Sequence, residues 1–363
     1  MKRLVLLSYD YPPNNGGIAR LCGGIVRELK GRSYPYLVVT NVRSDHSDSD
    51  NVVRISGKRG ILEWRILKFL RNNTTNDDIV LCDTWHPAGF LSLLSGRDTY
   101  ILCHGAELMS GKGFFKKHIK PVYRKWVLNH CKGAIANSQY TERLISSLDK
   151  NIRSTTIALP VDSKLFHPTK TKNTTDNILR VCTISRIEKF KGHDFVLKTI
   201  ASLPKTYQSR INLTIGGKGP YLEELKQLTE MLNLNSIVQF KGFVPEQELC
   251  DFYSSNDIFI LCTREEPNNH HVEGFGLVFV EAQACGTATI GTNAGGIPSA
   301  ISDGNGGWLI EQDSSSKLMT LLKKLIDDKE YAQSQGAVAR LRVLKECSWA
   351  EYMEKLFAFI KTY

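Results

Sequence analysis

Two glutamates in the last third of the chain have a spacing that could place carboxylates around one ligand. Glu273 and Glu281 lie eight positions apart, separated by a Gly-Phe-Gly turn and an apolar run. The run 277–284 predicts a buried helix ending before Gly286, so that Glu273 precedes the helix and Glu281 lies about one turn inside it. Backbone N–H groups at a helix start attract anions. The pattern suits a ligand with a sugar, a phosphate and a ribose, and equally a surface acid followed by a capping acid.

Two cations occupy a loop that follows a predicted strand earlier in the chain. Arg186 and Lys191 bracket this loop just before a helix. Two cations so spaced can hold a diphosphate, because guanidinium and ammonium groups both bind phosphate oxygens. The turn 216–220 ends the next strand and starts a helix with a proline at its first position. The loop with Arg186 and Lys191 is therefore a candidate diphosphate site.

Two loops in the first half of the chain are further candidates. Gly16 and Gly17 lie between a strand and a helix, where backbone can approach a phosphate closely. They match neither the dinucleotide fingerprint nor the P-loop, and an ordinary turn also explains them. His104 closes another strand, either as a ligand contact or as a structural hydrogen-bonding residue.

The segment 111–127 combines apolar and basic residues at helical spacing. One face of a helical wheel holds Phe115, Ile119, Val122 and Trp126, and the remainder holds Lys116, Lys117, Lys120, Arg124 and Lys125. Such a helix can lie on anionic lipid, although Pro121 would kink it. A solvated basic helix packed on the sheet is the alternative. The candidate membrane or acceptor residues are the five cations and Trp126.

Strand-like runs alternate with helical patterns along the chain, which indicates an α/β fold with parallel sheets. The expected strands of the first half are 3–9, 36–40, 51–55, 78–82, 99–104, 133–137 and 155–159. Those of the second half are 178–185, 211–216, 237–241, 257–262 and 288–292. The polar segment 160–176, with two prolines, is the predicted linker, and the segment 348–363 is a predicted terminal helix.

Length and composition restrict the protein class. A chain of 363 residues predicts two domains. Residues 1–170 carry 26 basic against 14 acidic side chains, whereas the remainder carries 21 against 23, so an anionic partner of the first half is expected. That partner could be a membrane surface, nucleic acid or a phosphorylated substrate. Nine scattered cysteines without a Cys-x-x-Cys pair or a His cluster predict a cytoplasmic protein without a metal site.

Together these motifs resemble the retaining glycosyltransferases of family 4, which have the two-domain GT-B fold. The resemblance extends over nearly the whole chain, and the spaced glutamates combined with the Arg/Lys loop are its specific part. It rests on Gly16-Gly17, His104-Gly105-x-Glu107, Asn137-Ser138-x-x-Thr141, Pro160-Val-Asp162-x-x-x-Phe166-x-Pro168, Ser185-Arg186, Lys191-Gly192-x-Asp194, Gly217-x-Gly219-Pro220, Glu273 with Glu281, and Gly295-Gly296.

The resemblance implies two Rossmann-like domains facing a cleft. Residues 1–168 would form the acceptor-binding domain, to which the C-terminal helix 348–363 crosses back. Residues 169–347 would form the domain that binds the nucleotide-sugar.

The resemblance also implies residue roles. Arg186 and Lys191 would bind the donor diphosphate, and Glu281 would accept hydrogen bonds from the ribose. Glu273 and His104 would contact the sugar, and with Arg186 and Lys191 they are the candidate catalytic residues. The remaining donor-binding candidates are Gly16, Gly17, Phe243, Val244, Gly274, Phe275, Gly276 and Leu277.

The expected activity is retaining, metal-independent transfer of a hexosyl unit, with GDP-mannose favoured as donor. No cofactor is expected. The expected acceptor is a lipid-linked saccharide or glycan in the synthesis of lipopolysaccharide, O-antigen or another surface polysaccharide. The protein would be cytoplasmic and would associate with the anionic inner face of the cell membrane, without a nucleic-acid partner. The alternatives are a sugar-nucleotide epimerase of the same fold and a non-catalytic nucleotide- or nucleic-acid-binding protein.

Overall fold

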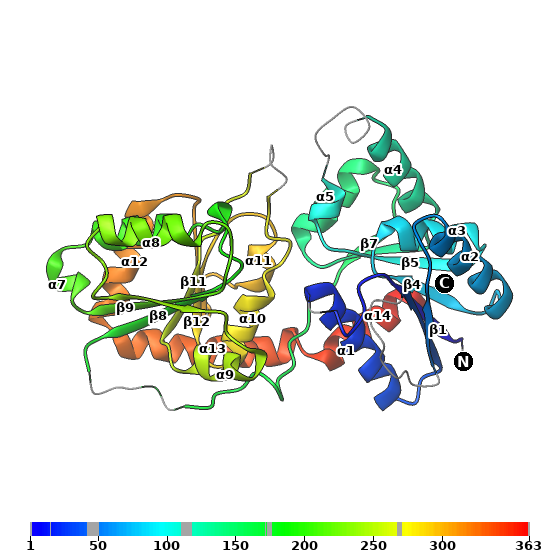
Figure 1. Cartoon of the computed structure of the whole chain (residues 1–363). Helices are drawn as coiled ribbons and strands as arrows, with labels where there is room; N and C mark the ends of the chain where they lie inside the picture. Colours follow the sequence, from blue (N-terminus) through cyan, green and yellow to red (C-terminus); the bar gives the residue numbers. More distant parts are fainter. Residues whose placement is uncertain are drawn as a thin grey trace. The chain divides into compact units, whose positions relative to one another are not determined.

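The computed structural model describes residues 2–14, 16–41, 51–109, 118–170, 172, 176–266 and 271–361. The chain divides into two compact units, one formed by Met1–Leu159 with Trp349–Tyr363 and the other by Pro160–Ser348. Each unit contains one sheet covered by helices (Figure 1). Among the described residues, no helix combines the length and the apolar character needed to cross a membrane.

The first unit is built on a parallel sheet with the strand order β3-β2-β1-β4-β5-β6-β7. The strands are β1 (Leu4–Ser8), β2 (Tyr36–Asn41), β3 (Val52–Ile55), β4 (Ile79–Cys82), β5 (Asp98–Cys103), β6 (Gly133–Ala136) and β7 (Ser154–Thr156). Strand β1 pairs with both β2 and β4, so that Leu4 lies opposite Tyr36 on one side and Ile79 on the other. The strand order reverses between β1 and β4, and ligands bind at the carboxyl ends of strands at such a point.

Four helices of the first unit share one core with the sheet. The helices of this unit are α1 (Gly17–Gly31), α2 (Ile61–Asn73), α3 (Phe90–Leu94), α4 (Lys120–His130), α5 (Gln139–Leu148) and α14 (Trp349–Lys361). A cluster of buried side chains joins the sheet to Ile66 of α2, Leu91 of α3, Val127 of α4 and Ile145 of α5. These four helices therefore cover the same face of the sheet.

The C-terminal helix α14 lies on the other face. Ile101 of β5 belongs to the core under α2–α5, and its neighbour Tyr100 donates a hydrogen bond to the carbonyl oxygen of Ile360 at 3.1 Å. Successive side chains of a strand point to opposite faces, so α14 packs opposite α2–α5. It contacts α1 there, where the Arg27 guanidinium lies 5.4 Å from the ring centre of Trp349.

The second unit is built on a parallel sheet with the strand order β10-β9-β8-β11-β12-β13. The strands are β8 (Leu179–Ile184), β9 (Ile211–Gly216), β10 (Val238–Gly242), β11 (Ile258–Leu261), β12 (Ala288–Thr292) and β13 (Gly307–Ile310). Strand β8 lies between β9 and β11, so that the order reverses there as it does at β1 in the first unit. The carboxyl end of β8 is therefore the expected ligand-binding position of this unit.

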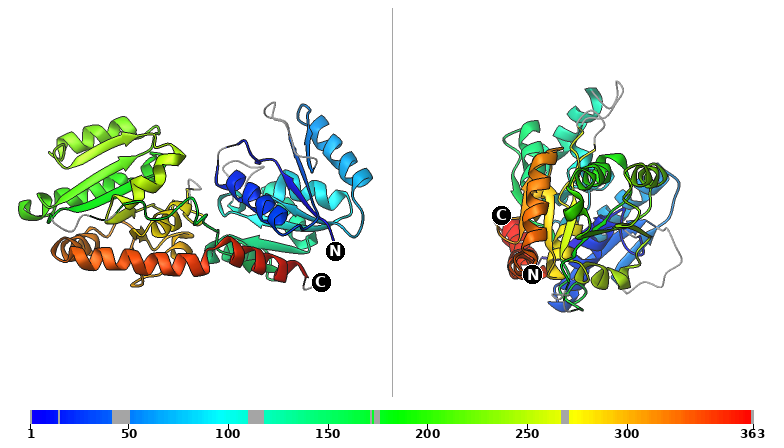
Figure 2. Two further views of the ribbon diagram at one scale, coloured as in Figure 1. Left: turned by 90° about the horizontal axis from the view of Figure 1, so that it is seen from below. Right: turned by 90° about the vertical axis from the view of Figure 1, so that its left-hand side faces the viewer.

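Helices cover both faces of the second sheet. They are α6 (His193–Ala201), α7 (Lys205–Gln208), α8 (Leu222–Met231), α9 (Glu246–Ser254), α10 (Leu277–Ala284), α11 (Ile297–Ala300), α12 (Ser315–Asp327) and α13 (Lys329–Glu346). Leu197 of α6, Leu225 of α8 and Leu322 of α12 belong to one core cluster with the strands. Figure 2 shows the orange α13 on the opposite side of the sheet from the yellow-green α8, and α13 contacts α10 there.

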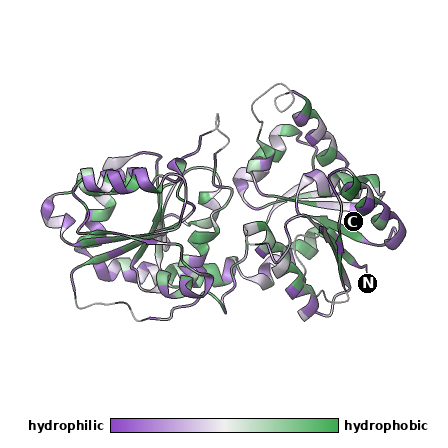
Figure 3. Cartoon of the chain, viewed as in Figure 1, coloured by the Kyte–Doolittle hydropathy of each residue, from purple (hydrophilic) through white to green (hydrophobic). Residues whose placement is uncertain are grey.

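The hydropathy of the strands explains why each sheet lies between layers of helices. The buried strands are near-continuous apolar runs, as expected for parallel strands covered on both faces. Figure 3 shows many of these strands in green, whereas purple residues are frequent along the helices.

Most strands lie within a residue or two of the predicted positions, but two features differ. The short strand β13 was not predicted, because its apolar run, 308–310, has only three residues and follows two glycines. The sequence assigned residues 160–168 to the first unit, whereas they pack on the second. There Val161 N–H donates to the carbonyl oxygen of Cys347 at 2.8 Å, and the Phe166 ring contacts Tyr253.

Candidate active site

The loop between β8 and α6 carries the predicted diphosphate-binding cations. After β8, the chain forms a short 3₁₀ turn at Lys189–Lys191 and reaches α6 through Gly192. The Arg186 side chain is 74% exposed, and its Nε lies 2.9 Å from Glu188 Oε1. Lys191 lies on the same loop and is far less exposed. The two cations therefore share a loop, but only Lys191 is held inside the fold.

Lys191 and Glu273 form an ion pair, which joins two residues predicted for the same site. Lys191 Nζ lies 2.7 Å from Glu273 Oε2, and their side chains are 15% and 19% exposed. Water screens such a pair less than an exposed one, so its electrostatic energy is larger. An ammonium has three N–H donors, so Lys191 can bind Glu273 and a phosphate oxygen together. The structure thus places a cation and a carboxylate side by side at the carboxyl end of β8.

The backbone that carries Glu273 is fixed by close packing against a glycine. Gly296 N–H donates to the carbonyl oxygen of Glu273 at 2.7 Å. A Cβ at Gly296 would lie 1.8 Å from the carbonyl oxygen of Gly274, so no larger residue fits. Gly276, at φ +92°, then directs the chain into α10 in a conformation that favours glycine. Gly274, Phe275 and Leu277 therefore form a rigid entry to the helix.

Glu281 lies inside α10, where it is buried with a tyrosine. Its Oε2 accepts a hydrogen bond from Tyr253 Oη at 3.0 Å. Burial, reinforced by the Glu281 charge, raises the pKa of Tyr253 well above its usual value. The hydroxyl therefore remains a proton donor and fixes the carboxylate. The predicted position of Glu281, about one turn into the helix, agrees with the structure.

Arg264, which follows β11, clamps the Lys191 loop and was not identified from the sequence. Its Nη1 and Nη2 donate to the two Asp194 carboxylate oxygens at 2.8 and 3.2 Å, and its Nε donates to Asp313 at 2.9 Å. Its backbone N–H and Nη1 also donate to the carbonyl oxygens of Phe190 and Lys189. Burial opposes ionisation of Asp194, but the Arg264 guanidinium outweighs it and lowers the pKa of that carboxyl.

His193 supports the first residues of the same loop. Its Nε2 lies 2.9 Å from Ser185 Oγ, and its ring is buried. Burial lowers the pKa of His193 to about 4, and the nearby Lys191 charge acts in the same direction. The imidazole is therefore neutral at physiological pH and adds no charge beside Lys191.

The ends of β9 and β10 lie beside the β8 loop. Ile187 N–H donates to the carbonyl oxygen of Lys218, and Gly217 N–H donates to that of Gly242. Phe243 follows β10 with an exposed ring, and Lys218 Nζ lies 5.8 Å from its centre. The next residue, Val244, is buried. Phe243 thus presents an aromatic face and Val244 supports the loop.

In the first unit a buried carboxylate organises the loop before α1. Asp83 Oδ2 accepts hydrogen bonds from Ser8 Oγ and from the N–H groups of Tyr9 and Asp10 at 2.9, 2.6 and 3.1 Å. Burial raises the pKa of Asp83. Gly16 and Gly17 follow this loop, with Gly16 extended and Gly17 at the first position of α1.

The His104 side chain is fixed by its neighbours. Its Nε2 lies 2.8 Å from the carbonyl oxygen of Asp83, which can only accept, so Nε2 carries the proton. Its backbone N–H donates to Glu107 Oε1 at 2.6 Å, and Asn137 Nδ2 donates to its carbonyl oxygen at 3.1 Å. Asn137 in turn accepts from Thr141 Oγ1 at 2.7 Å. The His-Gly-x-Glu and Asn-Ser-x-x-Thr motifs therefore form one hydrogen-bonded group.

The proposed basic face of segment 111–127 is only partly correct. Arg124 is buried, and its Nη1 donates to the carbonyl oxygens of Glu107 and Met109, so it does not face a membrane. The buried residues of helix α4 are Arg124, Val127 and Leu128, so the face that packs inward differs from the predicted apolar face. Lys125 pairs with Asp149 at 3.0 Å.

The other residues of that face have different positions. Lys120 lies over the Trp85 ring, and Trp126 is partly exposed beside His130. Lys116 and Lys117 lie outside the described residues. Within the described ranges, no three His, Cys, Asp or Glu side chains are grouped as metal ligands.

Comparisons with known proteins define the class of protein. The family model for glycosyl transferases group 1 matches residues 163–342. Over 387 aligned residues, the chain is 25% identical to a GDP-mannose-dependent α-(1-6)-phosphatidylinositol monomannoside mannosyltransferase of Mycobacterium tuberculosis, covering 99% of this chain and 98% of that protein. It is 30% identical over 234 residues to a GDP-mannose-dependent monoacylated α-(1-6)-phosphatidylinositol monomannoside mannosyltransferase of Corynebacterium glutamicum, covering 64% and 59% of the two chains.

The fold matches solved glycosyltransferase structures. HepE of Anabaena, crystallised with UDP and glucose, superposes with a TM-score of 0.77 at 17% identity, covering all of both chains. The chain is therefore a glycosyltransferase with the GT-B fold. The match of residues 163–342 to glycosyl transferases group 1 confirms the glycosyltransferase class expected from the motifs, and the superposition on HepE confirms the expected fold.

The two glutamates should give separable kinetic defects. We expect Glu281→Ala mainly to weaken donor binding and Glu273→Ala mainly to lower kcat, each by about 10- to 100-fold for a lost hydrogen bond to a charged group. Steady-state kinetics in donor concentration measure both effects. Tyr253→Phe is the control, because it removes one hydrogen-bond donor to Glu281 but keeps the carboxylate. Identical defects in the two glutamate variants would contradict this division of roles.

Arg264 should act through Lys191 as a positioning residue. Arg264→Lys loses the two-pronged contact with Asp194, so we expect donor KM to rise about tenfold or more. We also expect Arg264→Met to raise the donor KM more than Arg264→Lys does. Arg210→Lys is the matched control, because Arg210 also pairs with an aspartate, Asp327, and lies away from the Lys191 loop. A fall in stability with unchanged KM would mean that Arg264 is structural only.

His193 should make stability depend on pH between about 6.5 and 4. The unfolded chain binds a proton in this window that the folded chain excludes, so the free energy of unfolding falls as pH falls, by at most about 3 kcal/mol. His193→Gln should show a shallower slope in urea denaturation, because glutamine does not titrate. An equal slope for His193→Gln and the native protein would refute the assignment.

Proposed function

We propose that this glycosyltransferase moves a hexosyl unit from a nucleotide-sugar, with GDP-mannose favoured, to a membrane glycolipid or lipid-linked saccharide with retention of the anomeric configuration. The observation that carries this proposal is the Lys191–Glu273 pair at the carboxyl end of β8, next to the start of α10. The Lys191 cation suits a diphosphate, and the Glu273 carboxylate suits a sugar hydroxyl. The helix start adds N–H groups for an anion.

The chemistry follows from where charge develops. Cleavage of the bond between sugar and phosphate leaves an oxocarbenium-like sugar and a nucleoside diphosphate that gains negative charge. Fixed cations stabilise that charge best in the transition state, because they do not reorganise during the reaction. Lys191 is fixed by Glu273, and Arg186 on the same loop is exposed and can reach a bound diphosphate. The two cations can replace a metal ion, so we propose a metal-independent reaction.

The two glutamates are assigned to opposite ends of the donor. Glu281 accepts hydrogen bonds from the ribose, and Glu273 positions the sugar together with the backbone of Phe275–Leu277. A retaining glycosidase uses one carboxylate as nucleophile and a second as acid. Here Glu281 is held for the ribose, so we propose that the acceptor attacks from the side of the leaving group without a covalent intermediate. A glycosyl adduct on Glu273, detected by mass spectrometry, would refute that step.

The donor and acceptor assignments draw on the relatives. Both mannosyltransferase relatives are described as GDP-mannose-dependent and as acting on phosphatidylinositol mannosides, which supports a mannosyl donor and a glycolipid acceptor for this chain. HepE was crystallised with UDP and glucose, so the fold itself does not select the base. Assignment to family 4, the lipopolysaccharide or O-antigen setting, and association with the inner face of the cell membrane remain predictions.

Donor choice and stereochemistry can be tested with the purified chain. GDP should raise the melting temperature more than UDP or ADP, because a ligand stabilises in proportion to the logarithm of its saturation. With GDP-mannose and a mannosylated phosphatidylinositol, we expect release of GDP and a new α-anomeric signal by NMR. A β-anomeric product would refute retention. Equal GDP release without any acceptor would refute transfer.

A further inference from the structure

Helix α13 packs against the C-terminal end of α10, the helix that carries Glu281. A Cβ at Gly336 of α13 would lie 2.1 Å from the carbonyl oxygen of Gly286, so the two segments approach backbone to backbone. Arg340 of α13 donates a hydrogen bond to the carbonyl oxygen of Ala284, the last residue of α10. The last carbonyl groups of a helix have no partner within it, so an arginine satisfies one of them. The end of α10 is therefore fixed on α13.

Arg342, two residues further along α13, joins α10 to the short helix α11. Its Nη2 donates to Gln283 Oε1 at 2.5 Å and to the carbonyl oxygen of Ala300, the last residue of α11, at 2.6 Å. Gln283 Nε2 also donates to the carbonyl oxygen of Ala300 at 3.2 Å and to Thr289 Oγ1 at 2.8 Å. The pair of Arg342 Nη1 with Glu346 Oε2 at 3.0 Å orients the guanidinium. Three helices thus meet at one guanidinium group.

These hydrogen bonds are shielded from water. Gln283 is 1% exposed, and the Arg342 side chain is 8% exposed. Hydrogen bonds are stronger in such surroundings than in water, and each one polarises its neighbours. A guanidinium is planar and its donors have fixed directions, so it defines the positions of the groups that it binds.

The contacts of Arg342 reach the supports of both glutamates of the candidate site. Helix α10 carries Glu281 two residues before Gln283. Helix α11 begins directly after Gly296, whose N–H donates to the carbonyl oxygen of Glu273 at 2.7 Å. A shift of α10 would therefore move one carboxylate, and a shift of α11 would loosen the backbone of the other.

We propose that Arg342 is a positioning residue for the donor, which holds α10 and α11 where Glu281 and Glu273 can bind the two ends of one nucleotide-sugar. Its effect passes through Gln283 and Ala300. This inference rests on the proposed function, because that function assigns the two glutamates to the donor.

Calorimetric titration with GDP tests the proposal on the purified chain. Arg342→Met removes the contacts to both helices, and we expect the Kd of GDP to rise about tenfold, because small displacements of positioned groups have large effects. Arg342→Lys keeps a cation but not the planar guanidinium, so its Kd should lie between those of the native chain and Arg342→Met. UDP replaces GDP in the titration if the native chain binds UDP more tightly.

A second variant tests the route through α10. Gln283→Leu removes the side-chain acceptor of Arg342, and we expect a rise in Kd similar to that of Arg342→Met. The double variant should add only about twofold, because residues of one hydrogen-bond network do not act additively. In steady-state kinetics with GDP-mannose and a mannosylated phosphatidylinositol, the donor KM should rise by a larger factor than kcat falls. A merely structural role would lower the melting temperature without this difference.

Arg210→Met is the matched control in the same unit. Arg210 also donates to a carbonyl oxygen near a helix end, that of Ile326 in α12, at 2.6 Å. Within the described ranges, the buried Nε atoms of Arg210 and Arg342 both have no hydrogen-bond partner, so the two arginines are alike in burial cost. We expect Arg210→Met to leave the Kd of GDP unchanged.

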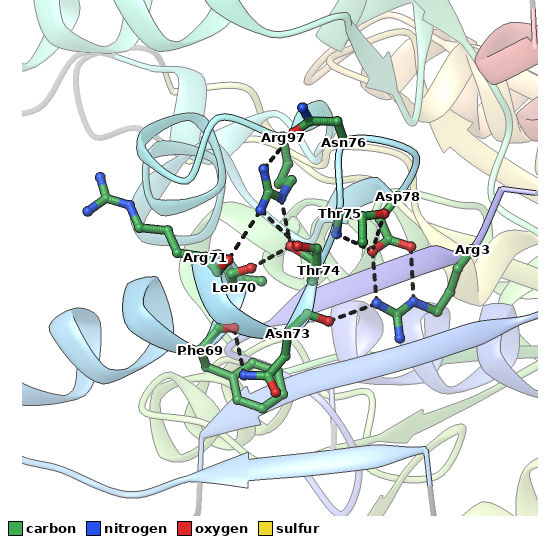
Figure 4. Close-up of polar contacts among 10 residues, drawn as sticks. All are labelled: Arg3, Phe69, Leu70, Arg71, Asn73, Thr74, Thr75, Asn76, Asp78 and Arg97. Atoms are coloured by element: carbon green, nitrogen blue, oxygen red, sulfur yellow. Dashed lines mark hydrogen bonds and ion pairs between the residues drawn. The ribbon is translucent and has the colours of Figure 1, made fainter.

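Arg97→Met is a second control, in the first unit. Figure 4 shows Arg97 at the end of α2, where its guanidinium donates to the carbonyl oxygen of Thr74 and to Asn76 Oδ1, each at 2.8 Å. We expect this variant to lower the melting temperature but not to change the Kd of GDP, because no donor-binding residue is assigned to α2.

The outcomes separate this inference from the proposed function. An unchanged Kd in Arg342→Met, or an equal rise in Arg342→Met and both controls, would overturn the inference and leave the proposed function standing. A native chain that binds neither GDP nor UDP would overturn the proposed function, and the inference with it.

Discussion

The ion pair between Lys191 and Glu273 is the interaction on which the candidate site depends. It joins the loop after β8 to the loop before α10, segments far apart in the sequence. Each partner has its own support. Arg264 holds the Lys191 loop through Asp194 and two backbone carbonyls, while Gly296 packs on the backbone of Glu273. Loss of either support would move one charge away from the other.

In the proposed site, helix α10 relates the two carboxylates that are assigned to the donor. Glu273 lies in the loop before its start, and Glu281 lies in its interior, where it accepts a hydrogen bond from Tyr253 of α9. A helix keeps these two groups at a constant separation, which is what the proposed recognition of sugar and ribose by one element requires. The pairing of Lys191 with Glu273 also follows from the nature of the lysine side chain. A flexible ammonium gains a defined position only when a partner fixes it.

The sequence predicted local features well and long-range ones poorly. The apolar run 277–284 and its flanking glycines predicted α10 with the correct bounds, because these signals lie next to each other in the chain. Arg264 was missed because its partners Asp194 and Asp313 are distant in sequence and no local pattern marks them. Arg124 was assigned to the wrong face because a helical wheel gives spacing but not the direction of the sheet. Its side chain is buried and donates hydrogen bonds to two carbonyl oxygens. Position-specific roles for His104, Glu273 and Glu281 remain predictions.

A double-mutant cycle on Lys191 and Glu273 tests the central claim most directly. The binding of GDP-mannose is measured by calorimetry for the native chain, Lys191→Met, Glu273→Gln and the double variant. We expect the two changes to be non-additive by about 1 kcal/mol or more, because residues in one ion pair share their effect. Strictly additive losses of affinity would contradict the account, since they would mean that the cation and the carboxylate act on the donor independently.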